Sequence, residues 1–140
     1  MDDFSSLFAL TPSISILDLN NQKTISELLN NIAKPYDGDV TTINSIDLKE
    51  MRLKVKRANY EYGIISNTIL DHNDQKTLLK IISMAIRDSG YIIIIEDKNK
   101  DYSPLYSLLE EYNYGTMSCV DIFEDYNLFI AQKVHMWGMD

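Results

Sequence analysis

Residues 91–95 read YIIII, and this run of four isoleucines constrains the fold more than any other feature of the sequence. Isoleucine is branched at Cβ and favours an extended strand. An unbroken apolar run leaves no polar face for solvent, so both faces of the strand must be covered. Such strands are typical of parallel sheets with helices on each side. The run therefore predicts a central strand of an α/β sheet.

Strand-like and helix-like segments alternate along the rest of the chain. Strands are predicted at residues 13–19, 40–46, 62–70, 91–95, 118–123 and 128–133. Helices, with apolar residues three and four positions apart, are predicted at 24–35, 75–88 with Gly90 as its stop, and 103–112. The last two strands are a hairpin length apart and so pair antiparallel. We predict an α/β three-layer sandwich with a mostly parallel twisted sheet and a C-terminal antiparallel hairpin.

Residues 48–58 fit two patterns. Leu48, Met51 and Val55 have the spacing of one helical face, but Met51, Leu53 and Val55 also alternate with basic residues as in a half-exposed strand. Two parallel strands flank this segment, and parallel neighbours need a crossover connection. The crossover favours the helix.

The chain length of 140 residues predicts a single domain over 1–140, with 1–12 as an N-terminal extension. A formal net charge of −8 disfavours nucleic acid and anionic membranes as partners. Cys119 is the only cysteine, and we expect it inside a buried strand and unreactive. A lone cysteine and an acidic N-terminus without a signal-peptide pattern predict a cytoplasmic protein.

Four stretches resemble the class I S-adenosylmethionine-dependent methyltransferase family. ISILDL and its polar turn resemble the first strand and cofactor loop, and YEYGIISNTILDH resembles the fourth strand and the loop beside the methyl-transfer site. DQKTLLKIISMAIRDSGYIIIIED resembles the next helix, glycine turn and fifth strand. LLEEYNYGTMSCVDIFEDYNLFIAQK resembles the last helix and antiparallel pair. The similarity spans most of residues 13–134 and implies a Rossmann-like, methyltransferase-like fold.

Two departures from the family bear on the cofactor. Only one clear strand fits between the first strand and Tyr60, so one βα unit is missing, and with it the acid that holds the cofactor ribose. Family loops carry glycines where this chain has Asn20, Gln22 and Thr24. Glycine permits the close backbone approach and sharp turn that side chains hinder. The comparison implies that no cofactor is bound in the usual pose.

If S-adenosylmethionine does bind, the resemblance places five residues around it. They are Asp18, Asn20, Asp47, Ser66 and Asn67. No catalytic residue is assigned. No metal is expected either, because the few histidines and the single cysteine offer no ligand set.

Each of these positions also has a purely structural interpretation. Asp18 is then an acid beside a helix at the solvent-facing end of a strand. Asp47, three residues before Glu50, is then a helix N-cap. His72 stands where small-molecule members of the family have a histidine, and a general-base role competes with simple solvation in a polar turn.

The favoured function is a degenerate methyltransferase-like domain that acts as a non-catalytic binding or interaction module. The alternative is an active small S-adenosylmethionine-dependent methyltransferase with an atypical loop. A third interpretation is a receiver-like domain, since YEYGIISNTILDHNDQKTLLKII resembles the segment around a receiver's central strand. Ser66 stands at its phosphoacceptor position, and the terminal hairpin does not fit.

Two surfaces are candidates for partners. A basic segment is the better candidate, either for an acidic protein or for RNA, with a simple solvated face as the default interpretation of such a charge run. Its cations are Lys49, Arg52, Lys54, Lys56 and Arg57. Large apolar residues near the C-terminus are the second, namely Met136, Trp137 and Met139. The edge left by the missing strand is expected to allow self-association with a second copy.

Overall fold

The computed structural model describes residues 2–19, 23–45 and 47–134. The helices are α1 (Asp2–Ser5), α2 (Lys23–Ala33), the 3-10 turn η1 (Lys34–Tyr36), α3 (Leu48–Lys54), α4 (Gln75–Ala85) and α5 (Pro104–Glu111). The strands are β1 (Ser15–Leu19), β2 (Asp39–Ile43), β3 (Tyr60–Ser66), β4 (Ile86–Asp97), β5 (Ser118–Val120) and β6 (Tyr126–Gln132). Strands and helices thus alternate up to α5 and end in a strand pair, as predicted.

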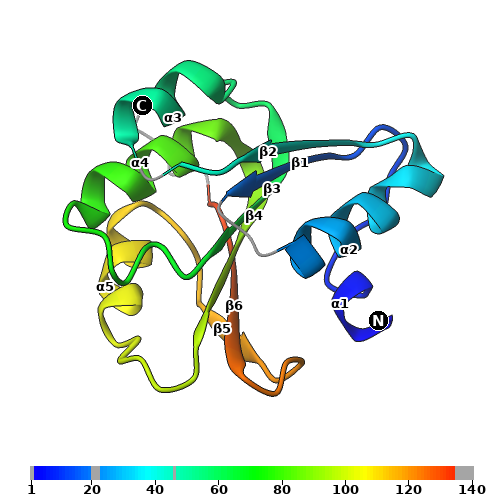
Figure 1. Cartoon of the computed structure of the whole chain (residues 1–140). Coiled ribbons are helices and arrows are strands. Elements are labelled where there is room, and N and C mark those ends of the chain that lie inside the picture. The colour runs from blue at the N-terminus through cyan, green and yellow to red at the C-terminus, as the bar shows by residue number, and fades with distance from the viewer. Residues whose placement is uncertain (1, 20–22, 46, 135–140) are drawn as a thin grey trace.

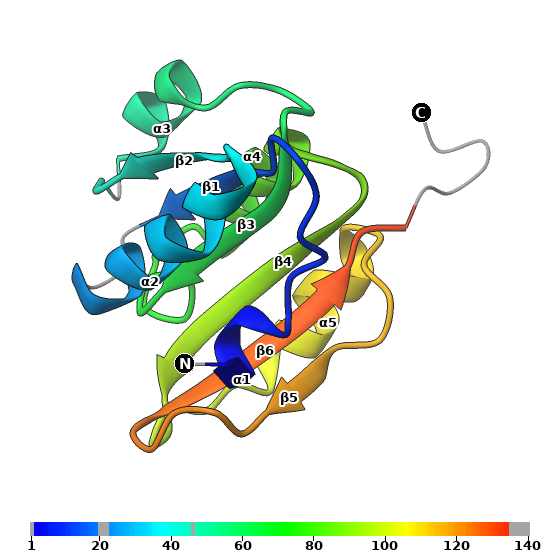
Figure 2. The ribbon, with the colours of Figure 1, turned by 90° about the vertical axis from the view of Figure 1, so that its right-hand side faces the viewer.

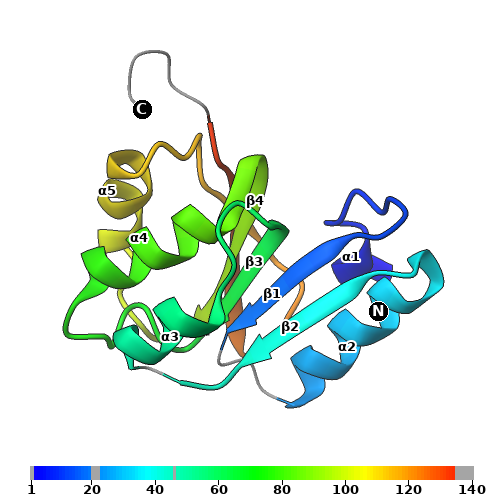
Figure 3. The same ribbon diagram turned by 90° about the horizontal axis from the view of Figure 1, so that it is seen from above.

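The strands form one sheet in the order β2-β1-β3-β4-β6-β5. The first four strands in this order pair in parallel, and β6 runs antiparallel to both of its neighbours. Figure 3 shows β2 at the outer edge beside β1. Among the described residues, β2 is the only strand between β1 and β3 in the chain, as the prediction of a missing βα unit requires.

Helices cover both faces of the sheet. Figure 1 shows α3, α4 and α5 on one side and α1 and α2 on the other, and Figure 2 shows α1 over the β4–β6 part of its face. The isoleucine run serves both cores, because Ile92 and Ile94 face the α4 side while Ile93 and Ile95 face the α2 side. All four side chains are buried, which confirms a doubly covered central strand.

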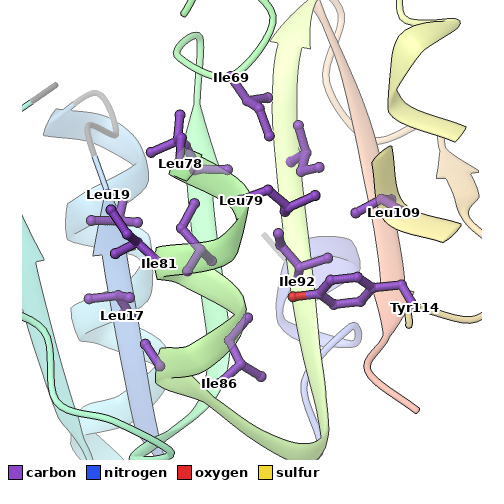
Figure 4. Packing of buried hydrophobic residues seen from close by; sticks show 14 of the residues in the cluster. Leu17, Leu19, Ile69, Leu78, Leu79, Ile81, Ile86, Ile92, Leu109 and Tyr114 are labelled. Atoms are coloured by element: carbon purple, nitrogen blue, oxygen red, sulfur yellow. The ribbon is translucent and has the colours of Figure 1, made fainter. Parts of the chain in front are cut away.

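The core on the α4 side is built around the apolar face of that helix. Figure 4 shows Leu78, Leu79 and Ile81 of α4 packed between β1 on one side and β4 and α5 on the other. Tyr114 adds a polar contact at the rim of this core, where its hydroxyl lies 2.9 Å from Ser83 Oγ. Burial raises the pKa of the Tyr114 phenol above its ordinary value.

The segment with two patterns is helical over its first half. The side chain of Asp47 accepts a hydrogen bond from the Lys49 backbone amide and caps α3. Met51 is fully buried beneath the helix, whereas Leu53 is exposed. The helix ends at Lys54. The alternation of Met51, Leu53 and Val55 does not mark one buried strand face, because Met51 is buried, Leu53 is exposed and Val55 is half-buried.

The end of α4 differs from the prediction. The helix stops at Ala85 rather than near Asp88, and Ile86 already pairs with Tyr60 of β3. The amides of Ala58 and Asn59 donate to the last carbonyls of α4, Met84 O and Ala85 O. Gly90 therefore lies within β4 and does not end the helix. These hydrogen-bond partners lie far away in the sequence, so the local pattern did not reveal them.

Three further predicted boundaries or environments are corrected. Strand β3 ends at Ser66, not at residue 70, because Asn67 adopts a left-handed backbone with φ 48°. Strand β5 covers only three residues. Cys119 is exposed on β5, because this short strand is the outer edge of the sheet. Among the described residues no helix has the length and apolar character needed to cross a membrane.

Candidate functional site

The sheet has a switch point between β1 and β3. The chain leaves β1 through α2 on one face to reach β2, and it returns through α3 on the other face to β3. In open α/β sheets, ligands bind outside the carboxyl ends of the strands at such a point. Of the predicted site residues, Asp18, Asp47, Ser66 and Asn67 lie on this side, at or after the ends of their strands. Asn20 lies outside the described residues.

Asp18 is fully buried on β1, so the prediction that it lies at a solvent-facing strand end is wrong, whereas its predicted place beside a helix is confirmed by Ser26 of α2. Its Oδ2 accepts hydrogen bonds from Ser26 Oγ of α2 at 2.7 Å and from Thr42 Oγ1 of β2 at 3.0 Å. Parallel pairing sets Asp18 opposite Thr42. A buried carboxylate is costly unless it is hydrogen-bonded, and these two hydroxyls supply partners. Asp18 thus joins three elements of the fold.

The next two predicted residues end β3 and tie it to β4. Ser66 is buried, and its carbonyl accepts a hydrogen bond from Thr68 Oγ1 at 2.8 Å. The amide of Asn67 donates to Ile95 O at 2.8 Å, and its side-chain Oδ1 accepts from the Asp97 amide at 3.2 Å. These contacts hold the ends of β3 and β4 level. The side-chain Oδ1 of Asn67 is thus occupied by a hydrogen bond within the protein.

An open depression of about 580 Å³ lies beside these strand ends. It is bounded by Asp47 and Leu48 at the start of α3 and by Asp71, His72 and Asn73 in the loop before α4. Asp47 combines its predicted N-cap role with a place on this wall. The carboxylates, the imidazole and the amide of these wall residues give the depression both hydrogen-bond donors and hydrogen-bond acceptors.

His72 is held by its own loop. Its Nδ1 accepts a hydrogen bond from the Asp74 amide at 2.9 Å, and its own amide donates to Ile69 O at 3.4 Å. The turn therefore holds the His72 ring in place at the wall of the depression.

A buried acid that the sequence reasoning missed lies at the end of β4. Glu96 is 1% exposed, and its Oε1 is 3.2 Å from Lys100 Nζ, which also contacts Asp71 Oδ2 at 2.6 Å. Burial raises the pKa of Glu96 above its ordinary value of 4.5, against the opposing effect of Lys100. For Lys100, burial lowers the pKa, but the two carboxylates together outweigh burial and raise it. The position of Glu96 directly after the isoleucine run was the available signal.

The lysine links the buried acid to the wall of the depression. Asp71, one of the wall residues, is 65% exposed, whereas Glu96 is enclosed, so Lys100 bridges solvent and core. Within residues 2–19, 23–45 and 47–134, no group of three His, Cys, Asp or Glu side chains is placed to hold a metal ion. The arrangement offers carboxylates, an imidazole and an amide for polar recognition.

The strand that follows α2 ends without an acid. Strand β2 is succeeded by Asn44 and Ser45, and Ser45 Oγ donates to Glu50 Oε2 at 3.1 Å and accepts from the Asp47 amide. Hydrogen bonds to Lys54 and Ser45 hold the pKa of Glu50 below its ordinary value. The polar groups at this strand end thus serve the start of α3.

Comparison with solved structures identifies the fold. An S-adenosylmethionine-dependent methyltransferase from Aquifex aeolicus matches with a TM-score of 0.73 and 12% identity, over 95% of this chain and 89% of that one. A putative methyltransferase from Bacillus halodurans matches at 0.67 and 9%, over 96% and 98%. A 16S rRNA methyltransferase from T. thermophilus, solved with AdoMet and guanosine, matches at 0.66 and 14%, over 95% of this chain but only 38% of its own.

These likenesses extend over most of the chain, and the domain has the class I methyltransferase-like fold. No protein-family model and no curated protein sequence matches the chain. The identities are low, so the matches define the architecture and the place of the switch point rather than an activity.

Proposed function

We propose that this domain is a degenerate methyltransferase-like module that binds a partner and does not hold S-adenosylmethionine in the usual pose. The observation that carries the proposal is the state of Asp18. Its carboxylate is fully buried and accepts hydrogen bonds from Ser26 and Thr42, so its role is to stabilise the fold. The side-chain Oδ1 of Asn67 likewise accepts a hydrogen bond from the Asp97 amide of β4.

The end of β2 supports the same proposal. A cofactor ribose is usually held by an acid at such a strand end. Here Asn44 and Ser45 occupy it, and Ser45 already bonds to Glu50 and to the start of α3. Among the described residues, the Asp18 carboxylate is thus bonded within the fold, and the two residues that follow β2 carry no carboxylate.

Titration calorimetry with S-adenosylmethionine and with S-adenosylhomocysteine tests the proposal. We expect no heat of binding at micromolar ligand with the full chain. The Asp18→Asn variant, measured beside it, should behave identically. A dissociation constant in the micromolar range for either ligand would contradict the proposal.

An active small methyltransferase is the second candidate function. The depression of about 580 Å³ beside the switch point, with His72 on its wall, is the observation that favours it. On this candidate, Asp18→Ala abolishes cofactor binding while the domain stays folded. Unchanged affinity in that variant, with a normal circular dichroism spectrum, would count against the enzyme.

A further inference from the structure

A groove of about 160 Å³ lies between α3 and α4, away from the strand ends that form the candidate site. Its lining residues are Arg52, Val55, Arg57, Ile81, Met84 and Ala85. The four apolar side chains form a hydrophobic floor, and the two arginines are exposed. A cavity of roughly 150 Å³ accepts a benzene-sized group, so this groove has room for one large apolar side chain.

Backbone contacts hold the groove in shape. Val55 N–H donates to Met51 O, and the Ala58 and Asn59 amides donate to the last carbonyls of α4. On the far side, Lys133 Nζ donates to Ser83 O at 2.7 Å and to Ile86 O at 2.8 Å. The hydrogen bonds of Ala58 and Asn59 join the segment after α3 to the end of α4 and so fix the two walls of the groove relative to each other.

The groove is positively charged in a chain that is otherwise acidic. Residues 49–57 carry five basic side chains and one acid, a net charge of +4, whereas the whole chain carries −8. The single acid, Glu50, pairs with Lys54 at 2.6 Å. Neither Arg52 nor Arg57 forms an ion pair with any residue that the structure describes.

We propose that this groove docks an acidic segment of a partner protein, which inserts one aromatic or large aliphatic side chain onto the floor and places carboxylates on Arg52 and Arg57. The inference rests on the proposed function as a binding module and names the partner class. Arginine pairs well with carboxylates and is favoured at interface anchors. A polar nucleic-acid backbone would leave the apolar floor unused and meet the acidic remainder of the surface.

Fluorescence polarisation with a designed probe tests this docking site. The probe is a fluorescein-labelled peptide with a central Leu-Phe pair flanked on both sides by glutamates. We expect saturable binding that weakens as salt rises, because the charges are near the surface. A probe with glutamines for the glutamates, and one with serines for Leu-Phe, should each bind at least about fivefold more weakly.

Matched variants of the full chain locate the binding. Arg52→Glu and Arg57→Glu should each weaken the probe by about fivefold or more, while Lys80→Glu, with the same change in net charge, should not. Met84→Gln on the floor should weaken it, while Leu53→Gln, at an 81% exposed position outside the groove, should not. These side chains are exposed, and circular dichroism checks that each variant is folded.

Three results would overturn the docking site. They are absence of binding at millimolar probe, binding unaffected by both arginine variants, and equal competition by poly(U) RNA. The cofactor titration is independent, so a micromolar cofactor affinity would reject the proposed function while probe binding still reports on the groove.

Discussion

At the scale of single residues, Asp18 is the side chain on which three elements depend. Replacing it with asparagine removes the charge that Ser26 and Thr42 hydrogen-bond. Hydrogen bonds to a charged group contribute about 1.5 to 3 kcal/mol each. We expect Asp18→Asn to lower the free energy of unfolding by about 2 to 4 kcal/mol in urea denaturation.

The matched control for this substitution is Asp39→Asn. Asp39 is an exposed acid at the start of β2, and its replacement changes the net charge by the same amount. We expect a change of no more than about 0.5 kcal/mol there. Equal stability of the two variants would show that the hydroxyl contacts of Asp18 contribute little.

Glu96 gives a pH dependence of defined sign. Burial makes its pKa higher in the folded chain than the ordinary 4.5, so the folded state is favoured while the carboxyl is protonated. That contribution is complete below 4.5 and is lost as pH rises through the raised value. Compared with Glu96→Gln, the natural protein should therefore lose stability as pH increases above about 4.5.

Urea unfolding at a series of pH values measures this difference. The control is Glu124→Gln, because Glu124 is exposed in the connection before β6. We expect its curve to run parallel to that of the natural protein. A natural protein whose curve runs parallel to that of Glu96→Gln would contradict the raised pKa.

At the scale of elements, the close pairing of β3 and β4 depends on Gly90. A Cβ there would lie 2.6 Å from Ile86 Cγ2 and 2.8 Å from Glu61 O. Overpacking of this kind costs about 1 to 3 kcal/mol, so Gly90→Ala should lower the melting temperature by several degrees. At Gly115 the nearest atom to an added Cβ is 3.6 Å away, and Gly115→Ala should melt like the natural protein.

Local patterns predicted the elements whose side chains repeat regularly. The four isoleucines of β4 and the apolar stripe of α4 are examples. A strand buried on both faces shows a continuous apolar run, and a helix buried on one face shows apolar residues three and four positions apart. The end of α4 left no such trace. It depends on the amides of Ala58 and Asn59, which are supplied from the preceding crossover.

The position of the candidate site in the fold was predictable, but the hydrogen-bond partners of its side chains were not. Resemblance placed Asp18 beside the switch point, but only the fold brings Ser26 and Thr42 to its carboxylate. Glu96 was missed for the opposite reason. A polar residue after an apolar run is typical of the start of a loop. The burial of Glu96 involves two separate loops, one before α4 that carries Asp71 and one after β4 that carries Lys100.

At the scale of the whole molecule, the open edge of β2 predicts association. Its outward backbone groups have no strand beyond them among the described residues, and such edges pair with further strands. We expect a concentration-dependent dimer in size-exclusion chromatography with light scattering. Thr41→Lys on β2 should abolish it, while Ser118→Lys on the opposite edge should not. A monomer at every concentration would dismiss the edge contact.

The exposed thiol of Cys119 is a labelling site from which distances across the sheet can be measured. It is the only cysteine, and it lies on β5 with four strands between it and β2. Adjacent strands are about 4.8 Å apart, so spin labels on two copies joined through their β2 edges would be about 50 Å apart. Copies joined through β5 would bring the labels to within roughly 10 Å. The distance between spin labels on Cys119 of two copies, measured by electron paramagnetic resonance, thus shows which edge of the sheet a second copy uses.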